Sequence, residues 1–266
     1  MEVLGYFAAV FIGVSLGMLG GGGSILTVPV LVYFFGVTPF AATTYSLFIV
    51  GISSLVGSIN YFRKGLVDFK VIFLFGVPSV ATIFFTRRFL LSAIPSQCAI
   101  ANFSLNRNTF LMIAFAALML FAAVTMLRKN KITNESNQDN QYKPIRRKLL
   151  LLSGLGVGFV SGILGAGCGF LIVPALVLCV HLPMKKAIGT SLAIIALNSF
   201  TGFLFSPDYS VINWRMFSII SGIAVAGIFI GARIAINRSD SILRKGFAIL
   251  MLCVAIWIFT KELFLL

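Results

Sequence analysis

The sequence predicts an all-α polytopic membrane protein with about eight spans, built from two inverted-topology repeats. Of its 266 residues, 59% are hydrophobic and 11% are charged, and the mean hydropathy is +1.04, which leaves too little polar surface for a water-soluble globule. The apolar runs last about 17 to 25 residues, which favours helices over the short alternating strands of a membrane barrel. A repeated glycine-rich phrase predicts the two repeats, and the distribution of Lys and Arg predicts their orientation.

The glycine-rich phrase occurs at Gly17–Pro29 and again at Gly162–Pro174, and seven of its thirteen positions are identical. Glycine runs interrupt helices, and inside a membrane a broken helix is tolerated only where protein or a water-filled cavity satisfies the freed backbone groups. Each phrase therefore predicts a helical hairpin with a binding site at its break. Close helix packing through small residues is the alternative interpretation.

Each repeat is predicted as a glycine-broken hairpin followed by three transmembrane helices. In the first repeat the two arms are 3–20 and 24–36, and the spans are 39–62, 68–87 and 107–127. In the second the arms are 148–166 and 169–181, and the spans are 184–205, 213–236 and 243–263. Matching residues lie 145 apart at first and 132 apart later, so the first repeat carries about 13 extra residues, expected within 89–107. The expected division is a first repeat at 1–128, a cytoplasmic polar linker at 129–147 and a second repeat at 148–266.

Positive charge predicts opposite orientations for the two repeats. Seven Lys and Arg residues lie between 128 and 148, which places the linker in the cytoplasm. Lys185 and Lys186 are a second inside signal, so the hairpin between them and the linker enters the membrane and returns to the same side. In the first repeat, Arg63 and Lys64 mark an inside loop, whereas the counterpart of Lys185 and Lys186 is uncharged. Three arginines fall outside in this scheme and count against it: Arg87, Arg88 and Arg107.

An anion site is predicted where the two hairpins meet. Opposed repeats bring the starts of the second arms, near Ser24 and Gly169, to one midplane cavity, and helix N-termini offer free N–H groups and a positive dipole end. The break residues expected to bind substrate are Gly20, Gly21, Gly22, Gly23, Ser24, Gly165, Ala166, Gly167, Cys168 and Gly169. Polar residues on one face of each following span are expected to line the same cavity: Thr44, Ser46, Ser53, Thr190, Ser191 and Asn198. Ordinary helix packing is the alternative for this polar face.

Several functions are disfavoured by residue type and position. All seven carboxylates lie at span ends or in loops, which argues against an intramembrane proton relay. A single histidine, His181, and four cysteines without CxxC spacing predict no metal site, cofactor, disulfide framework or enzyme activity. The net charge of +14 is interpreted as topology signals and lipid contacts, not nucleic-acid binding. Arg88 and Arg233 are interface anchors or, alternatively, attract anions at the mouths of the pathway.

The two glycine phrases, together with Ala187–Leu192 and the weaker Ala42–Leu47, resemble the sulfite exporter TauE/SafE family over nearly the whole chain. The resemblance implies a multi-pass permease of a bacterial-type inner membrane that exports sulfite or an organosulfonate. Its expected partners are the small anion, membrane lipid and, as an open possibility, further copies of itself. A membrane-embedded thiol-dependent sulfur-handling protein using Cys168 is the alternative function, and a scaffold without flux is a third.

Overall fold

The regular structure of the chain is helical throughout the part described by the computed structural model, which covers residues 2–90, 107–128, 147–164, 169–180, 182–206 and 214–264. The first half contains α1 (Glu2–Leu19), α2 (Gly22–Phe35), α3 (Pro39–Arg63), α4 (Phe69–Val71), η1 (Ile72–Gly76), α5 (Val77–Phe85), η2 (Thr86–Leu90) and α7 (Arg107–Arg128). The second contains α8 (Arg147–Leu164), α9 (Gly169–Cys179), α10 (Met184–Leu204), α11 (Trp214–Ile236) and α12 (Asp240–Phe264). The predicted helical segments match these bounds to within three residues.

The helices have the length and surface of membrane spans. Within the described residues, five helices are long and apolar enough to cross a bilayer: Ala41–Arg63, Phe69–Phe89, Met184–Leu204, Ser218–Ile236 and Asp240–Lys261. Shorter apolar helices include Leu4–Leu19, Gly22–Phe35, Met112–Leu127 and Gly169–Leu178. Large apolar side chains, including Phe11, Phe73, Phe121 and Leu152, are exposed on the outside of the protein. The predicted all-α class is confirmed for the described residues, and the five long apolar helices are compatible with the predicted membrane protein. The expected linker and most of the extra segment lie outside the described residues.

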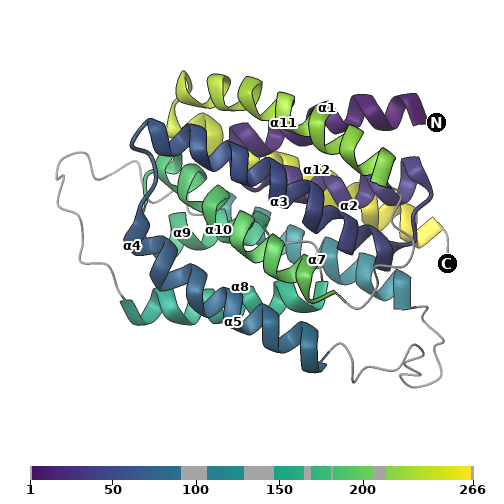
Figure 1. The fold of residues 1–266 in the computed structure, drawn as a ribbon, viewed down its shortest axis with the longest axis horizontal. Helices are drawn as coiled ribbons and strands as arrows, with labels where there is room; N and C mark the ends of the chain where they lie inside the picture. The colour runs from purple at the N-terminus through teal and green to yellow at the C-terminus, as the bar shows by residue number, and fades with distance from the viewer. Residues whose placement is uncertain are drawn as a thin grey trace.

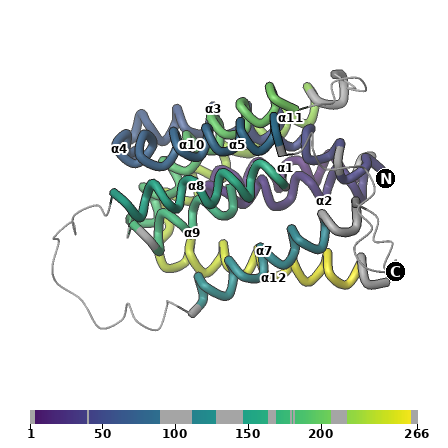
Figure 2. Tube along the Cα trace, turned by 90° about the horizontal axis from the view of Figure 1, so that it is seen from below, coloured from purple at the N-terminus to yellow at the C-terminus, as the bar shows by residue number. Residues whose placement is uncertain are grey.

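The central pair of helices consists of α3 and α10, which run antiparallel. The hydroxyl oxygens of Thr44 and Ser206 lie 2.8 Å apart at one end of the pair, and a Cβ atom at Gly189 would lie 3.0 Å from that of Tyr61 at the other. Figure 1 shows α1 and α11 along one edge of the molecule and α5 and α8 along the opposite edge. Figure 2 shows α7 beside α12, and the start of α1 at the same end as the end of α12.

Close contacts recur at the 145-residue offset with the partners exchanged. A Cβ atom at Gly57 would lie 3.2 Å from Leu192, and one at Gly202 would lie 3.2 Å from Leu47. At the edges of the molecule, a Cβ atom at Gly13 would clash with the backbone of Ala224, and one at Gly158 would clash with that of Ser79. In each pair of contacts, adding 145 to the first residue number and subtracting 145 from the second gives the residues of the other contact.

The helix from Phe69 to Leu90 is irregular for a local reason. Asp68 caps its start by accepting hydrogen bonds from the backbone of Lys70 and Val71. Pro78 follows, and its missing N–H leaves no normal donor for a carbonyl one turn earlier. The segment just before it, Ile72–Gly76, adopts π-helical bonding, the type of local adjustment that accommodates such a break.

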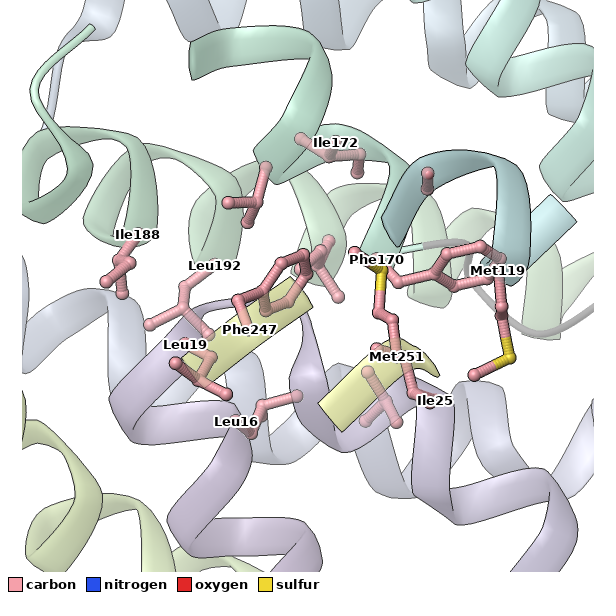
Figure 3. Close-up of a cluster of buried hydrophobic side chains, with 14 of the residues drawn as sticks. Leu16, Leu19, Ile25, Met119, Phe170, Ile172, Ile188, Leu192, Phe247 and Met251 are labelled. Carbon is pink, nitrogen blue, oxygen red and sulfur yellow. The ribbon is translucent and has the colours of Figure 1, made fainter. Parts of the chain in front are cut away.

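The interior around the first helix break is apolar. Figure 3 shows Leu16, Leu19 and Ile25 from the first hairpin packed among Phe170, Leu192, Phe247 and Met251 from the second half. All these side chains are buried. The hairpins are therefore held in place by packing from several other helices.

Candidate functional site

The first glycine phrase breaks the helix at two residues, as predicted. Helix α1 ends at Leu19 and α2 begins at Gly22. Gly20 has φ of +73°, a left-handed conformation that residues with a Cβ atom adopt only with strain. A Cβ atom there would also lie 2.7 Å from Ser191 Oγ and 2.9 Å from Ile188 Cα. Gly20 is thus required by both its backbone conformation and its surroundings.

A tyrosine from α3 satisfies a carbonyl group that the break leaves free. In a continuous helix the carbonyl of Gly17 would accept a hydrogen bond from the N–H of Gly21, four residues later. Gly21 lies outside the helix, and the hydroxyl of Tyr61 donates to the Gly17 carbonyl instead, at 2.8 Å. Tyr61 is 1% exposed. Our sequence reasoning missed this residue, because its position near the end of an apolar run carries no sign of its partner.

The start of α9, in the second glycine phrase, lies directly against the first break. A Cβ atom at Gly21 would lie 2.7 Å from the carbonyl carbon of Gly169 and 3.0 Å from Phe170 Cα. One at Gly169 would lie 3.0 Å from the hydroxyl oxygen of Ser24. Ser191 Oγ lies 3.4 Å from the carbonyl oxygen of Gly20. The structure therefore brings five predicted site residues into one buried cluster, which we call the tip junction: Gly20, Gly21, Ser24, Gly169 and Ser191.

The electrostatics of the tip junction favour negative charge. Helices α2 and α9 both begin there, and the first turn of a helix has a positive dipole end and N–H groups without partners inside the helix. No side chain caps α2 at Gly21, and the Ser24 hydroxyl donates to the Gly21 carbonyl at 2.7 Å. The described carboxylates Asp68 and Asp240 lie elsewhere, at the starts of α4 and α12. Hydroxyl groups and helix N-termini form the chemical environment in which proteins bind small oxoanions.

In the described part of the chain, no group of three or more His, Cys, Asp or Glu side chains lies close enough together to hold a metal ion.

Two residues of the first glycine phrase serve helix packing. A Cβ atom at Gly23 would lie 2.7 Å from the carbonyl oxygen of Ile12, and one at Gly22 would lie 3.1 Å from that of Ser15. These glycines let α2 fold back closely on α1. The two interpretations of the phrase therefore apply to different residues: Gly22 and Gly23 close the hairpin, whereas Gly20 and Gly21 form its tip.

Two predicted threonines lie toward the ends of their spans. Thr44 shares a hydrogen bond with Ser206, and the Thr190 hydroxyl accepts one from the backbone N–H of Asp68, at 3.0 Å. Each threonine thus contacts the segment that follows the opposite central helix. Ser46 donates to the Thr43 carbonyl of its own helix and is fully buried.

Polar groups also gather where α3 and α10 cross. The hydroxyls of Ser53, Ser54 and Ser199 and the side-chain oxygen of Asn198 are buried and have no hydrogen-bond partner among the described residues. The amide nitrogen of Asn198 donates to Ser79 on α5 at 2.8 Å. Ser53 and Asn198 were predicted as site residues. Ser54 and Ser199 were not, although they match each other at the 145-residue offset, and that match was the available signal.

The second break itself falls outside the described residues, and with it the predicted site residues Gly165, Ala166, Gly167 and Cys168. The adjacent arginines of η2, Arg87 and Arg88, differ in their surroundings. Arg87 is 3% exposed and donates to the carbonyl oxygen of Gly202 near the end of α10, at 2.9 Å, whereas Arg88 is exposed. Arg87 therefore stabilises a helix C-terminus, where a cation is favourable.

Replacing Tyr61 with phenylalanine is expected to destabilise the protein by about 1 to 3 kcal/mol, because the Gly17 carbonyl would lose its donor inside the protein. Thermal unfolding of the detergent-purified variant measures this. Tyr6 lies on α1 with its ring against Phe35, so Tyr6→Phe tests the loss of a tyrosine hydroxyl away from the break. Equal stability of Tyr61→Phe and the wild-type protein would contradict the assignment.

Comparison with known proteins identifies the family of the chain. The family model for the sulfite exporter TauE/SafE matches residues 5–258. A probable membrane transporter protein of Xylella fastidiosa is 31% identical over 259 residues, covering 94% of this chain and 92% of its own. The probable membrane transporter protein YunE of Bacillus subtilis is 29% identical over 253 residues, covering 90% and 88%. No solved structure matches the chain. The chain therefore belongs to the sulfite exporter TauE/SafE family of membrane transporters.

Proposed function

We propose that the protein is a secondary transporter of a bacterial-type inner membrane that exports a small oxoanion, sulfite or an organosulfonate, by alternating access. The observation that carries the proposal is the tip junction, where the starts of α2 and α9 meet at Gly21 and Gly169 in the buried interior. Two positive helix ends brought together repel each other unless an anion lies between them. The family supplies the class of anion.

The proposed architecture has two inverted repeats, at 1–128 and 148–266. The antiparallel pairing of the equivalent helices α3 and α10 supports it, as do the contacts that recur with exchanged partners at the 145-residue offset. The proposed orientation places the starts of α10 and α12 in the cytoplasm. In support, the backbone of Met184 donates to Asp240 at 2.7 Å, and Lys185 donates to the Ile236 carbonyl, so these two basic segments lie together.

The bodies that would move past each other combine helices from both repeats. Gly17 and Gly231 bring α1 and α11 into backbone contact, and Gly154 and Gly158 do the same for α8 with η1 and α5. Each first arm is therefore joined to a span of the other repeat. In the proposed cycle these two composite units tilt about the central α3–α10 pair, and substrate at the tip junction is exposed to one side at a time. In the proposed cycle, the buried apolar side chains in Figure 3 separate the tip junction from water when it is open to neither side.

Reconstitution into liposomes tests the function. Vesicles with an inside-negative potential should release internal sulfite when they contain the protein, because each exported negative charge gains about 2.3 kcal/mol per 100 mV. The variant Cys168→Ser should retain this efflux, since the proposed site needs no thiol at that position. Efflux no faster than from protein-free vesicles, for sulfite and for simple sulfonates, would refute the proposal. Loss of efflux in Cys168→Ser alone would favour the thiol-dependent alternative.

A further inference from the structure

A surface cavity of about 590 Å³ lies between the C-terminal end of α3 and α11. Asn60 lines it from α3 and Lys64 from the residue directly after that helix, and α11 contributes Phe229, Ile230, Arg233 and Ile234. Since Ile228 on α11 also contacts Gly57, the two helices run in the same direction along the cavity. The cationic residues of both helices therefore lie toward the same end of it.

The polar part of the cavity is positively charged. Lys64 and Arg233 are both exposed, and the described residues that line the cavity include no carboxylate. Asn60 adds an amide that can donate a hydrogen bond. An ammonium group, a guanidinium group and an amide facing one space suit a singly charged phosphate ester, because the guanidinium can bind two of its oxygens.

The other part of the cavity is apolar and exposed. Phe229, Ile230 and Ile234 are exposed large hydrophobic residues on a helix with the length and composition of a membrane span. They precede or flank Arg233 along α11, so the apolar part extends from the charged end toward the middle of the helix. A ligand that fills both parts is amphipathic, with an anionic head at the end of the helix and a hydrocarbon chain along it.

The polar residues that line the cavity are not all repeated at the 145-residue offset. The 145-residue offset matches Arg233 with Arg88, but it matches Asn60 with Phe205 and Lys64 with Tyr209. A pathway for the transported anion must open to both sides of the membrane in turn, whereas a lipid site can occur in one leaflet only. The asymmetry favours a lipid over the transported anion.

We infer that this cavity binds an anionic phospholipid, with the phosphate at Lys64, Arg233 and Asn60 and an acyl chain along Phe229 and Ile230. The orientation proposed above places this lipid in the cytoplasmic leaflet, where anionic headgroups attract basic residues. Binding of the lipid does not depend on the transport proposal, because it requires only the residues that line the cavity.

Native mass spectrometry of the full-length protein in uncharged detergent tests the inference, with phosphatidylglycerol and phosphatidylcholine as probes. The wild-type protein should bind phosphatidylglycerol more tightly than phosphatidylcholine. The double variant Lys64→Ala, Arg233→Ala should bind phosphatidylglycerol about thirty-fold more weakly, since each basic residue near an anionic headgroup contributes a factor of about five to the affinity and the two factors multiply. Arg238→Ala, Lys245→Ala removes two exposed cations outside the cavity and should keep the wild-type affinity.

Three results would overturn the inference. Equal affinity for the two lipids would show that the anionic headgroup is not recognised. An equal loss of affinity for phosphatidylglycerol in both double variants would show that the lipid is held by general surface charge and not by this cavity. Displacement of phosphatidylglycerol by millimolar sulfite or inorganic phosphate would identify the cavity as a mouth of the anion pathway instead. The assay measures no flux, so its outcome is separate from that of the transport experiment.

Discussion

Replacement of Gly21 with alanine is expected to abolish sulfite efflux from proteoliposomes. The added methyl group would meet the backbone of Gly169 and Phe170, which cannot move as a flexible side chain can. Insertion of one carbon into such a contact typically costs about 1 to 3 kcal/mol and pushes the two segments apart. Because these segments carry the N-termini of α2 and α9, their separation disrupts the proposed anion site directly.

Gly156 provides the matched control for Gly21. It lies within α8, and a Cβ atom there would meet nothing within 4 Å. Gly156→Ala should retain efflux and be as stable as the wild-type protein or slightly more so, because alanine restricts the unfolded chain. Sulfite efflux at the wild-type rate in correctly folded Gly21→Ala would show that the tips need not touch for transport.

Gly231→Val is expected to cause the largest loss of stability among these substitutions. A Cβ atom at Gly231 would clash with the carbonyl oxygen of Val14 and lie 2.8 Å from the backbone nitrogen of Met18. Both obstacles belong to the α1 backbone, and valine adds two further methyl groups, so the cost should reach or exceed about 3 kcal/mol. Thermal unfolding in detergent measures the loss, and transport should fall because α1 carries the first hairpin.

The control for Gly231 lies on the same helix. Gly222 is exposed, and a Cβ atom there would meet nothing within 4 Å. Gly222→Ala should therefore be neutral or stabilising. If Gly231→Val were equally well tolerated, the close packing of α1 against α11 would not be a rigid contact, and the composite units proposed for the transport cycle would lose their basis.

Helix positions could be predicted from the sequence because apolar runs and glycine or proline residues mark their ends. Pro39 and Met184 begin the two central helices as expected, and the break at Gly20 and Gly21 lies where the glycines are most concentrated. The meeting of Ser24 with Gly169 was also predictable, since it follows from the repeat and the charge pattern together. These features depend on local sequence and on symmetry.

Long-range hydrogen bonds could not be predicted in this way. Tyr61 bonds to Gly17 from 44 residues away, and nothing in the apolar sequence around it signals that contact. Arg87 and Arg88 are identical in type and adjacent, yet only Arg87 turns inward to the end of α10. Thr190 is a third example: its position on a polar face predicted a role in lining the cavity, but did not indicate the hydrogen bond that its hydroxyl accepts from the backbone of Asp68.

Equilibrium binding of sulfite to the purified protein, measured by titration calorimetry, tests the central claim that the tip junction holds the anion. The double variant Ser24→Ala, Ser191→Ala removes both hydroxyls of the junction without adding bulk. Ser58→Ala, Ser153→Ala is the control, because these hydroxyls also donate to nearby carbonyls, as Ser24 and Ser191 do, but belong to residues outside the tip junction. We expect the junction variant to bind sulfite about a hundredfold more weakly, since a hydrogen bond to a charged group contributes about 1.5 to 3 kcal/mol, and the control to bind normally. Wild-type affinity in the junction variant would contradict the assignment of the site.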